Sequence, residues 1–309
     1  MTRLLVARTT SGKNLDADLG LLRPVGGGSR LWQGRTKYLL GAICLALCVV
    51  MLAPIVFSIM ASIKPTVEAS AVPPTYFPRE ISLESYGKLW NYGSGLPKYL
   101  GNSLITAFLT IGFILFLTVP AGYGLARFPI PGKEGIFVLL LLALIIPYQA
   151  LLTPIFLMFS RLGLTNSLVG LAIIHTTIQL PFSLYIMRNA FEGVPRELEE
   201  AAYVDGANSW QVLRRVALPT VVPAVITVTL FAFVISWNEF LGALVMLNTD
   251  RSYTLPLILA AARTVTSLGS TDWGMLQAGV TISIIPCVLI YLLLQRYYVS
   301  GLLSGAVKN

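Results

Sequence analysis

Charge is what this sequence has least of. Only 12% of its 309 residues are Asp, Glu, Lys or Arg, whereas about 25% is usual in soluble domains. Hydrophobic residues make up 55% of the chain, which is more than a soluble core of this size can use. This shortage of charge excludes a soluble globular fold and predicts an integral membrane protein.

The residues that enzymes and metal sites use are also scarce. The chain has one histidine, His175, and neither an HExxH nor a GxSxG motif. One histidine cannot supply a metal cluster. Cys44, Cys48 and Cys287 all fall in apolar runs and indicate no disulfide framework. We therefore predict no catalytic residues, no metal and no enzyme activity. A membrane-embedded transferase or hydrolase, the enzyme alternative, would need clustered acids or histidines at a membrane face.

Two further absences concern the source of energy. The sequence lacks the GxxxxGK[ST] phosphate loop of an ATPase. Apart from Glu239, its apolar runs contain no Asp, Glu, Lys or Arg, whereas proton-driven carriers usually place titratable groups there. His175 is either a hydrogen-bonded packing residue, which we favour, or a proton relay. These absences predict that a partner supplies the energy.

Long apolar runs are what the sequence does have. Six are long enough to cross about 30 Å of hydrocarbon as helices, namely 38–63, 99–126, 136–157, 167–187, 220–247 and 274–295. We predict an all-α integral membrane protein with six transmembrane helices, which places both ends on one side. The segment before the first run contains seven basic residues and only two acidic ones, Asp16 and Asp18. This excess of positive charge predicts that both termini lie in the cytoplasm.

The chain divides into three predicted parts. Residues 1–37 form a basic cytoplasmic extension, expected to be disordered; residues 38–298 form the six-helix transmembrane domain; residues 299–309 form a cytoplasmic tail. The net charge of +8 is spread over the inner loops. It therefore indicates membrane topology and not nucleic-acid binding.

The densest group of acids lies between the fourth and fifth runs, in EEAAYVDGANSWQVLRRVALP at 199–219. Pro195 suits the first turn of a helix, which we expect to run from about 195 to 204. Three acids complement the positive end of its dipole: Glu197, Glu199 and Glu200. A small apolar face follows at helical spacing: Leu198, Ala201 and Ala202.

A second helix is expected after a break. Asp205-Gly206 ends the first helix, because glycine accepts the left-handed conformation common at a helix C-terminus. Asn208 or Ser209 can cap the second helix, and Pro219 is expected to open the next span. Its apolar stripe consists of Val212, Leu213 and Val216.

This helix–turn–helix could lie on the membrane surface or be held by another protein. An anionic inner leaflet would repel its acids, so the sequence favours a protein partner. A surface-lying amphipathic loop remains the alternative.

At this point a family resemblance becomes specific. EAAYVDGANSWQVLRRVALP, from Glu200 to Pro219, resembles the EAA loop of ATP-binding-cassette (ABC) importer permeases. YGLARFPIPGK at 123–133, SWNEFLGAL at 236–244 and QRYYVSGLLSGAVKN at the C-terminus follow the order of the carbohydrate-importer branch. The resemblance covers roughly residues 38–309 and is greatest to the second permease subunit of maltose-type systems. The long basic N-terminus departs from that pattern.

The resemblance implies a type I importer permease in a bacterial-type plasma membrane. Its implied partners are a second permease, two ABC ATPase subunits, an extracellular substrate-binding protein and a sugar. ATP and Mg²⁺ would be bound by the ATPase and no cofactor by this chain. In such importers the EAA loop, here within 195–219, docks in a cleft of the ATPase. The implied coupling residues are Glu200, Ala201, Ala202, Asp205, Gly206, Arg214 and Arg215.

A neutral polyhydroxylated solute suits a path lined by amides, hydroxyls and aromatic rings. The candidates for this path are Trp237, Asn238, Glu239, Gln179 and Asn102. The same residue types also pack helices together, so a structural role remains open for each. A stand-alone transporter or facilitator of small polar solutes remains the alternative function. It predicts transport by the purified chain alone.

Overall fold

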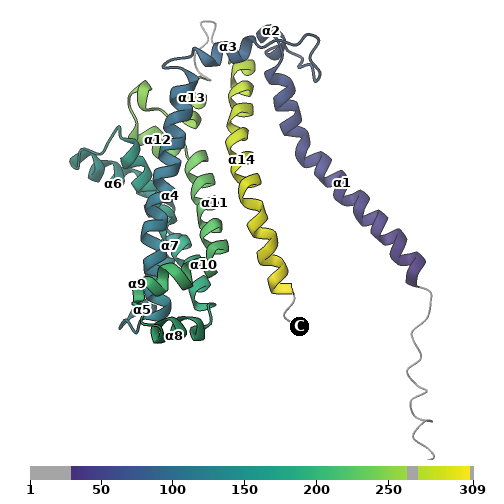
Figure 1. The fold of residues 1–309 in the computed structure, drawn as a ribbon. Helices are drawn as coiled ribbons and strands as arrows, with labels where there is room; N and C mark the ends of the chain where they lie inside the picture. The colour runs from purple at the N-terminus through teal and green to yellow at the C-terminus, as the bar shows by residue number, and fades with distance from the viewer. Residues whose placement is uncertain (1–28, 263–270, 307–309) are drawn as a thin grey trace, which may run out of the picture. The chain divides into compact units, whose positions relative to one another are not determined.

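The computed structural model describes residues 29–262 and 271–306, and within these ranges it contains helices and no β-strand (Figure 1). Side chains are described for residues 37–262 and 271–295. The chain falls into two units that meet between Pro54 and Ile55, and each unit is taken by itself below. The predicted all-α class is confirmed.

The first unit contains the start of α1 (Ser29–Ser62), a long apolar helix with Pro54 inside it. Lys37–Ser62 has a mean hydropathy of 2.8 and is long enough to cross a membrane, as predicted for residues 38–63. Most of the predicted N-terminal extension, residues 1–28, lies outside the described residues.

Three helices in mutual contact form the centre of the second unit: α4 (Leu96–Arg127), α7 (Leu168–Glu192) and α11 (Val222–Asn238) (Figure 1). The backbones of α4 and α7 approach closely at Gly122. A Cβ atom added there would lie 2.8 Å from the Met187 Cβ atom. Small residues allow membrane helices to pack in this way.

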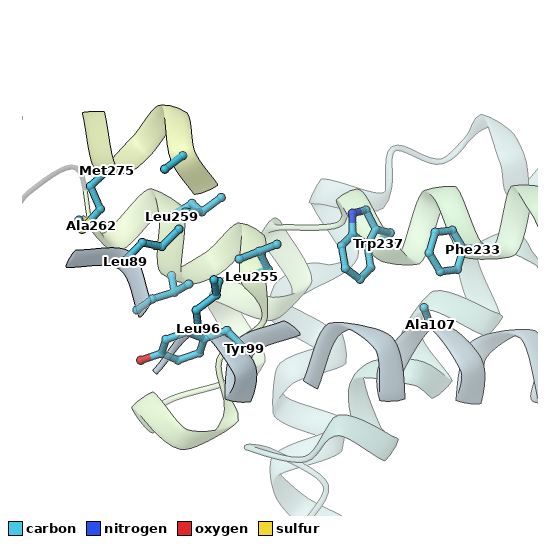
Figure 2. Close-up of a cluster of buried hydrophobic side chains, with 12 residues drawn as sticks. Leu89, Leu96, Tyr99, Ala107, Phe233, Trp237, Leu255, Leu259, Ala262 and Met275 are labelled. Atoms are coloured by element: carbon cyan, nitrogen blue, oxygen red, sulfur yellow. The ribbon is translucent and has the colours of Figure 1, made fainter. Parts of the chain in front are cut away.

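A hydrophobic cluster joins α4 and α11 to the end of the unit formed by α3 (Glu84–Trp90), α13 (Leu255–Ala262) and α14 (Trp273–Ala306). Figure 2 shows Phe233 and Trp237 of α11 beside Ala107 of α4. The Phe233 and Trp237 rings are nearly parallel, with centroids 5.6 Å apart. Leu89 of α3 is buried in the same cluster, so α3 packs against the long helices.

The third predicted span is not one helix. It consists of α5 (Lys133–Leu142), a 3-10 turn (Ala143–Ile145) and α6 (Tyr148–Arg161), with a bend of 103° between the two parts. Ile146 is extended (ψ 121°), because the ring of Pro147 disfavours helical geometry in the residue before it. Pro154, in contrast, is accommodated inside α6.

The fifth predicted span, 220–247, is also interrupted. A bend of 78° separates α10 (Leu218–Thr220) from α11, and Pro223, not Pro219, lies in the first turn of the long helix. At the other end, Glu239 is extended (ψ 129°) before α12 (Leu241–Met246) begins. The prediction that Pro219 opens this span is therefore wrong. The long helix starts anew near Pro223, because proline has no backbone N–H with which to continue the hydrogen bonds of the preceding helix.

Four described helical segments are long and apolar enough to cross a membrane: Lys37–Ser62, Leu96–Arg127, Leu168–Glu192 and Trp273–Gln295. The number reaches six if each of the two bent pairs forms one span. The chain is thus a multi-pass membrane protein built from helices.

Candidate functional site

Residues 195–219, named the coupling segment here after the role that the family resemblance implies, fold into two helical parts. Pro195 is extended (ψ 131°) and precedes α8 (Arg196–Val204), within one residue of the predicted helix. The second part comprises α9 (Ser209–Val212), a π-helical turn (Leu213–Ala217) and the start of α10. The predicted broken helix is confirmed, and the π-helical turn was not predicted.

The chemistry of the break agrees with its sequence. Gly206 has a φ of +84°, the left-handed conformation that glycine adopts without steric cost. Asn208 caps α9: its Oδ1 accepts the Gln211 backbone N–H at 2.9 Å, and the Gln211 side chain accepts the Asn208 N–H at 2.9 Å. Of the two predicted caps, Asn208 is therefore the correct one, and Ser209 is the first residue of α9.

One face of the coupling segment packs against the bundle. Val212, Leu213 and Ala217 are buried, and the last two join a cluster that includes Met187 of α7 and Val228 of α11. The predicted stripe of Val212, Leu213 and Val216 is thus largely buried, with Val216 partly exposed. Displacement of this segment would therefore disturb the contacts of at least two long helices.

Glu199 also belongs to the buried face. Its side chain is only 7% exposed and its Oε1 accepts the Arg127 Nε–H at 2.8 Å. The Tyr123 hydroxyl donates to Oε2 at 3.1 Å, and Arg127 Nη2 donates to the Val194 carbonyl at 2.6 Å. The sequence predicted only that Glu199, like Glu197 and Glu200, complements the dipole at the start of this helix. The burial of Glu199 against Tyr123 and the end of α4 was not predicted.

The opposite face of the coupling segment is exposed and partly apolar. Leu198 is 48% exposed, Val204 87% and Trp210 65%. Ala202 and Ala207 are partly buried. The remaining predicted coupling residues are all exposed: Glu200, Ala201, Asp205, Gly206, Arg214 and Arg215. An exposed apolar patch with a polar edge is typical of a surface that another protein or a membrane covers.

The five residues predicted to line a solute path do not form one surface. Trp237 is 2% exposed and its Nε1–H donates to the Ser283 carbonyl at 3.1 Å. Asn102 is also buried, and its Nδ2 donates to the Arg251 and Tyr253 carbonyls at 2.9 Å each. Asn238 is exposed and donates to the Val234 carbonyl. Trp237 and Asn102 thus hold neighbouring backbone in place.

Glu239 lies in a polar network that connects several elements. Its Oε2 is 3.1 Å from His175 Nε2, and its Oε1 accepts the Tyr148 hydroxyl at 3.3 Å. The backbone N–H groups of Gly242 and Ala243 also donate to this carboxylate. His175 Nδ1 is 2.9 Å from Ser236 Oγ. The prediction that His175 is hydrogen-bonded inside the bundle is confirmed.

Gln179 is buried one helical turn after His175 on α7. Neither polar atom of its side chain has a hydrogen-bond partner in the described part of the chain, and the same holds for Ser183 Oγ one turn further on. Buried polar atoms without partners are uncommon and need an explanation. Within the described ranges, no group of three or more His, Cys, Asp or Glu residues could hold a metal ion.

Comparison with known proteins agrees with this architecture. Residues 118–303 match the family "Binding-protein-dependent transport system inner membrane component". The chain belongs to this family. The permease is therefore the membrane component of an ABC importer and not an enzyme, and the family resemblance drawn from the sequence is confirmed.

Individual relatives support the same assignment. The permease is 36% identical to the probable ABC transporter permease protein YurM of Bacillus subtilis, over 73% of this chain and 74% of the relative. It is 33% identical to the diacetylchitobiose uptake system permease protein DasC of Streptomyces coelicolor, over 83% and 91%.

A solved structure shares the fold. It is a chain of a bacterial ABC transporter involved in the import of the acidic polysaccharide alginate. The TM-score is 0.75 at 24% identity, over 89% of this chain and 100% of that chain. The predicted importer-permease fold is confirmed.

Proposed function

We propose that the permease forms half of a membrane path for a sugar and that the coupling segment links this path to ATP hydrolysis by a separate subunit. One observation carries the proposal: a broken helix packs one face against α4, α7 and α11 while its other face stays exposed. DasC, named for diacetylchitobiose uptake, and the alginate importer chain support a carbohydrate as the solute.

The exposed face of the coupling segment is the docking surface for the ATPase. Leu198, Val204 and Trp210 provide apolar area that a protein cleft can bury. Glu200 and Asp205 provide charge at its edge, and Gly206 sets the turn between the two helical parts. Arg214 and Arg215 are exposed, and any ion pairs that they add are worth only about 0–1 kcal/mol each.

The complex that follows from this proposal has several parts. Two ABC ATPase subunits bind ATP and Mg²⁺, a second permease completes the path, and an extracellular binding protein delivers the sugar. The permease lies in a bacterial-type plasma membrane with both termini in the cytoplasm. We retain residues 38–298 as its transmembrane domain, between the N-terminal extension 1–37 and the tail 299–309.

The solute path itself is proposed from the five polar or aromatic candidates. Gln179 has a free amide that could bind a hydroxyl group in another conformation. Asn238 is exposed, next to Glu239. Trp237 and Asn102 are buried in this conformation, so they would contribute only if the surrounding helices separate.

The coupling proposal is tested by reconstituting the complete complex in proteoliposomes. A panel of sugars delivered by the binding protein identifies the solute that stimulates ATP hydrolysis. We then expect Glu200→Ala and Gly206→Val to leave membrane insertion intact but lower uptake per ATP hydrolysed at least about fivefold, the lower end of typical coupling effects. Gly206→Asn is the matched control, because asparagine tolerates the left-handed conformation. Full uptake by both Glu200→Ala and Gly206→Val would contradict the proposal.

The stand-alone transporter is tested in the same vesicles. The proposal predicts no sugar uptake by the purified permease without the partner permease and ATPase. Uptake by the single chain at the rate of the complete complex would favour the alternative.

A further inference from the structure

The Arg127–Glu199 ion pair joins parts of the chain that are far apart in sequence. Arg127 is the last residue of α4, and Glu199 lies in α8 of the coupling segment. Both side chains are more than nine-tenths buried, with Nε and Oε1 2.8 Å apart. Arg127 also donates to the Val194 carbonyl in the link between α7 and α8. One guanidinium group therefore holds the end of α4, this link and α8 together.

The ion pair is buried, whereas the proposed docking surface is exposed. Leu198 and Glu200, the neighbours of Glu199 in the sequence, are both exposed. A partner that moves the exposed face must act on the bundle through the buried contacts. Apolar packing has no preferred direction, whereas separating a buried ion pair leaves a charge uncompensated in a medium of low dielectric. The ion pair is thus the contact in this segment that best resists sliding.

Stability alone does not account for such a pair. Replacing a buried ion pair by apolar residues of similar volume is often neutral or even stabilising. What the pair does provide is a fixed position of α8 relative to α4. Tyr123, one turn before Arg127, strengthens this position by donating to the second Glu199 oxygen. The C-terminal end of α4 also favours the positive charge of Arg127.

We propose that the Arg127–Glu199 pair is a latch that makes α4 move together with the coupling segment during the ATP cycle. Glu199 and Arg127 are positioning residues in this proposal, which rests on the proposed coupling function. The latch predicts that the distance between α8 and α4 stays constant while the segment moves. Without the latch, α8 moves and α4 lags behind.

The test measures that distance by pulsed electron paramagnetic resonance in the complete complex. Spin labels are placed at Glu197→Cys on α8 and Gly112→Cys on α4, after the three native cysteines are replaced. Both sites are exposed, and their separation is on the order of 20 Å from the rise of α4. Distances are recorded without nucleotide and after trapping with ATP and vanadate. In the otherwise native complex we expect the same distance before and after trapping. In the Glu199→Gln complex we expect the distance to change on trapping.

Further variants separate the latch from a merely structural role. Glu192→Gln is the matched control, because Glu192 pairs with Arg188 inside α7 and should leave the distance unchanged. Tyr123→Phe keeps the ring but removes one donor to Glu199, so we expect a smaller shift. If Glu199→Gln prevents assembly, Tyr123→Phe decides the question alone.

Two results would overturn the latch. One is a change of the spin-label distance on trapping in the otherwise native complex. The other is that the Glu199→Gln and Tyr123→Phe complexes give the same distances as the otherwise native complex, both without nucleotide and after trapping. Neither result would affect the coupling function, since that is tested separately by uptake in Glu200→Ala and Gly206→Val.

Discussion

At the scale of single residues, the roles of the ionisable groups depend on what they face. Glu199 and Glu200 are adjacent in the sequence, yet Glu199 is buried against Arg127 while Glu200 is exposed. Glu239 shows the same dependence, because two backbone N–H groups and His175 surround its carboxylate. A residue type therefore identifies a candidate, and the contacts of its side chain assign the role.

Asp250 offers a test of one such contact outside the spans. The Ser94 and Tyr99 hydroxyls both donate to its carboxylate, Tyr99 at 2.7 Å. Burial raises the pKa of Asp250, but these hydrogen bonds outweigh it and hold the pKa below its ordinary value of 3.8. The stabilisation is therefore complete above the unfolded-state pKa and is lost as the pH falls through the lower, folded-state value.

We accordingly expect the melting temperature of the native permease to fall more steeply below about pH 4 than that of Asp250→Asn, which cannot titrate at this position. Thermal unfolding in detergent between pH 6 and pH 3 checks this difference. Parallel curves for the two proteins would show that the carboxylate contributes nothing to the pH dependence.

At the scale of elements, prolines and glycines explain where helices break and where they touch. Pro147 and Pro223 coincide with the two bends, whereas Pro120, Pro181 and Pro286 lie inside long helices. A proline alone therefore does not determine a break. The neighbouring residues must also leave the helical conformation, as Ile146 and Val221 do.

The contact between α4 and α7 gives a prediction at this scale. A Cβ atom at Gly122 would lie 2.8 Å from the Met187 Cβ atom and 3.1 Å from backbone atoms of Met187 and Arg188. Gly122→Ala should therefore force the helices apart and lower the free energy of unfolding by about 1–3 kcal/mol. Gly112→Ala on the same helix is the matched control, because nothing lies within 4 Å of the added atom.

Thermal or denaturant unfolding of the two variants provides the measurement. We expect Gly112→Ala to be neutral or slightly stabilising, since alanine favours helix over glycine by about 1 kcal/mol. Equal stability of the two variants would mean that α4 and α7 can separate without cost.

At the scale of the whole molecule, the α8–α9 end must face the cytoplasm if an ATPase is to dock on the coupling segment. Figure 1 shows α5, α8 and α9 at one end of the second unit and α3 at the other. The first end carries Arg127, Lys133 and Arg188, and the second carries Lys64, Arg79 and Lys88. Basic residues therefore occur at both ends. Lys88 pairs with Glu84 and Asp272, at 2.9 and 3.6 Å.

Cysteine labelling tests this orientation in a background without the native cysteines. Ser209→Cys and Glu80→Cys lie at opposite ends and replace exposed residues. A membrane-impermeant maleimide should label Glu80→Cys in intact cells but Ser209→Cys only after permeabilisation. Labelling of Ser209→Cys in intact cells would overturn the docking of the coupling segment on a cytoplasmic ATPase.

Local signals in the sequence were enough to predict the class of the protein, four of its six apolar spans as continuous helices and the broken helix of the coupling segment. These features follow from local properties of the sequence: its hydropathy, the acids and Pro195 at the start of the first short helix, and Gly206 at its end. Three findings required the packed helices: Glu199 faces Arg127 and Tyr123, Trp237 and Asn102 hold neighbouring backbone, and Gly122 lies against Met187. Each of these contacts joins residues more than forty positions apart, and helical periodicity gives the face on which a residue lies but not the partner that covers it.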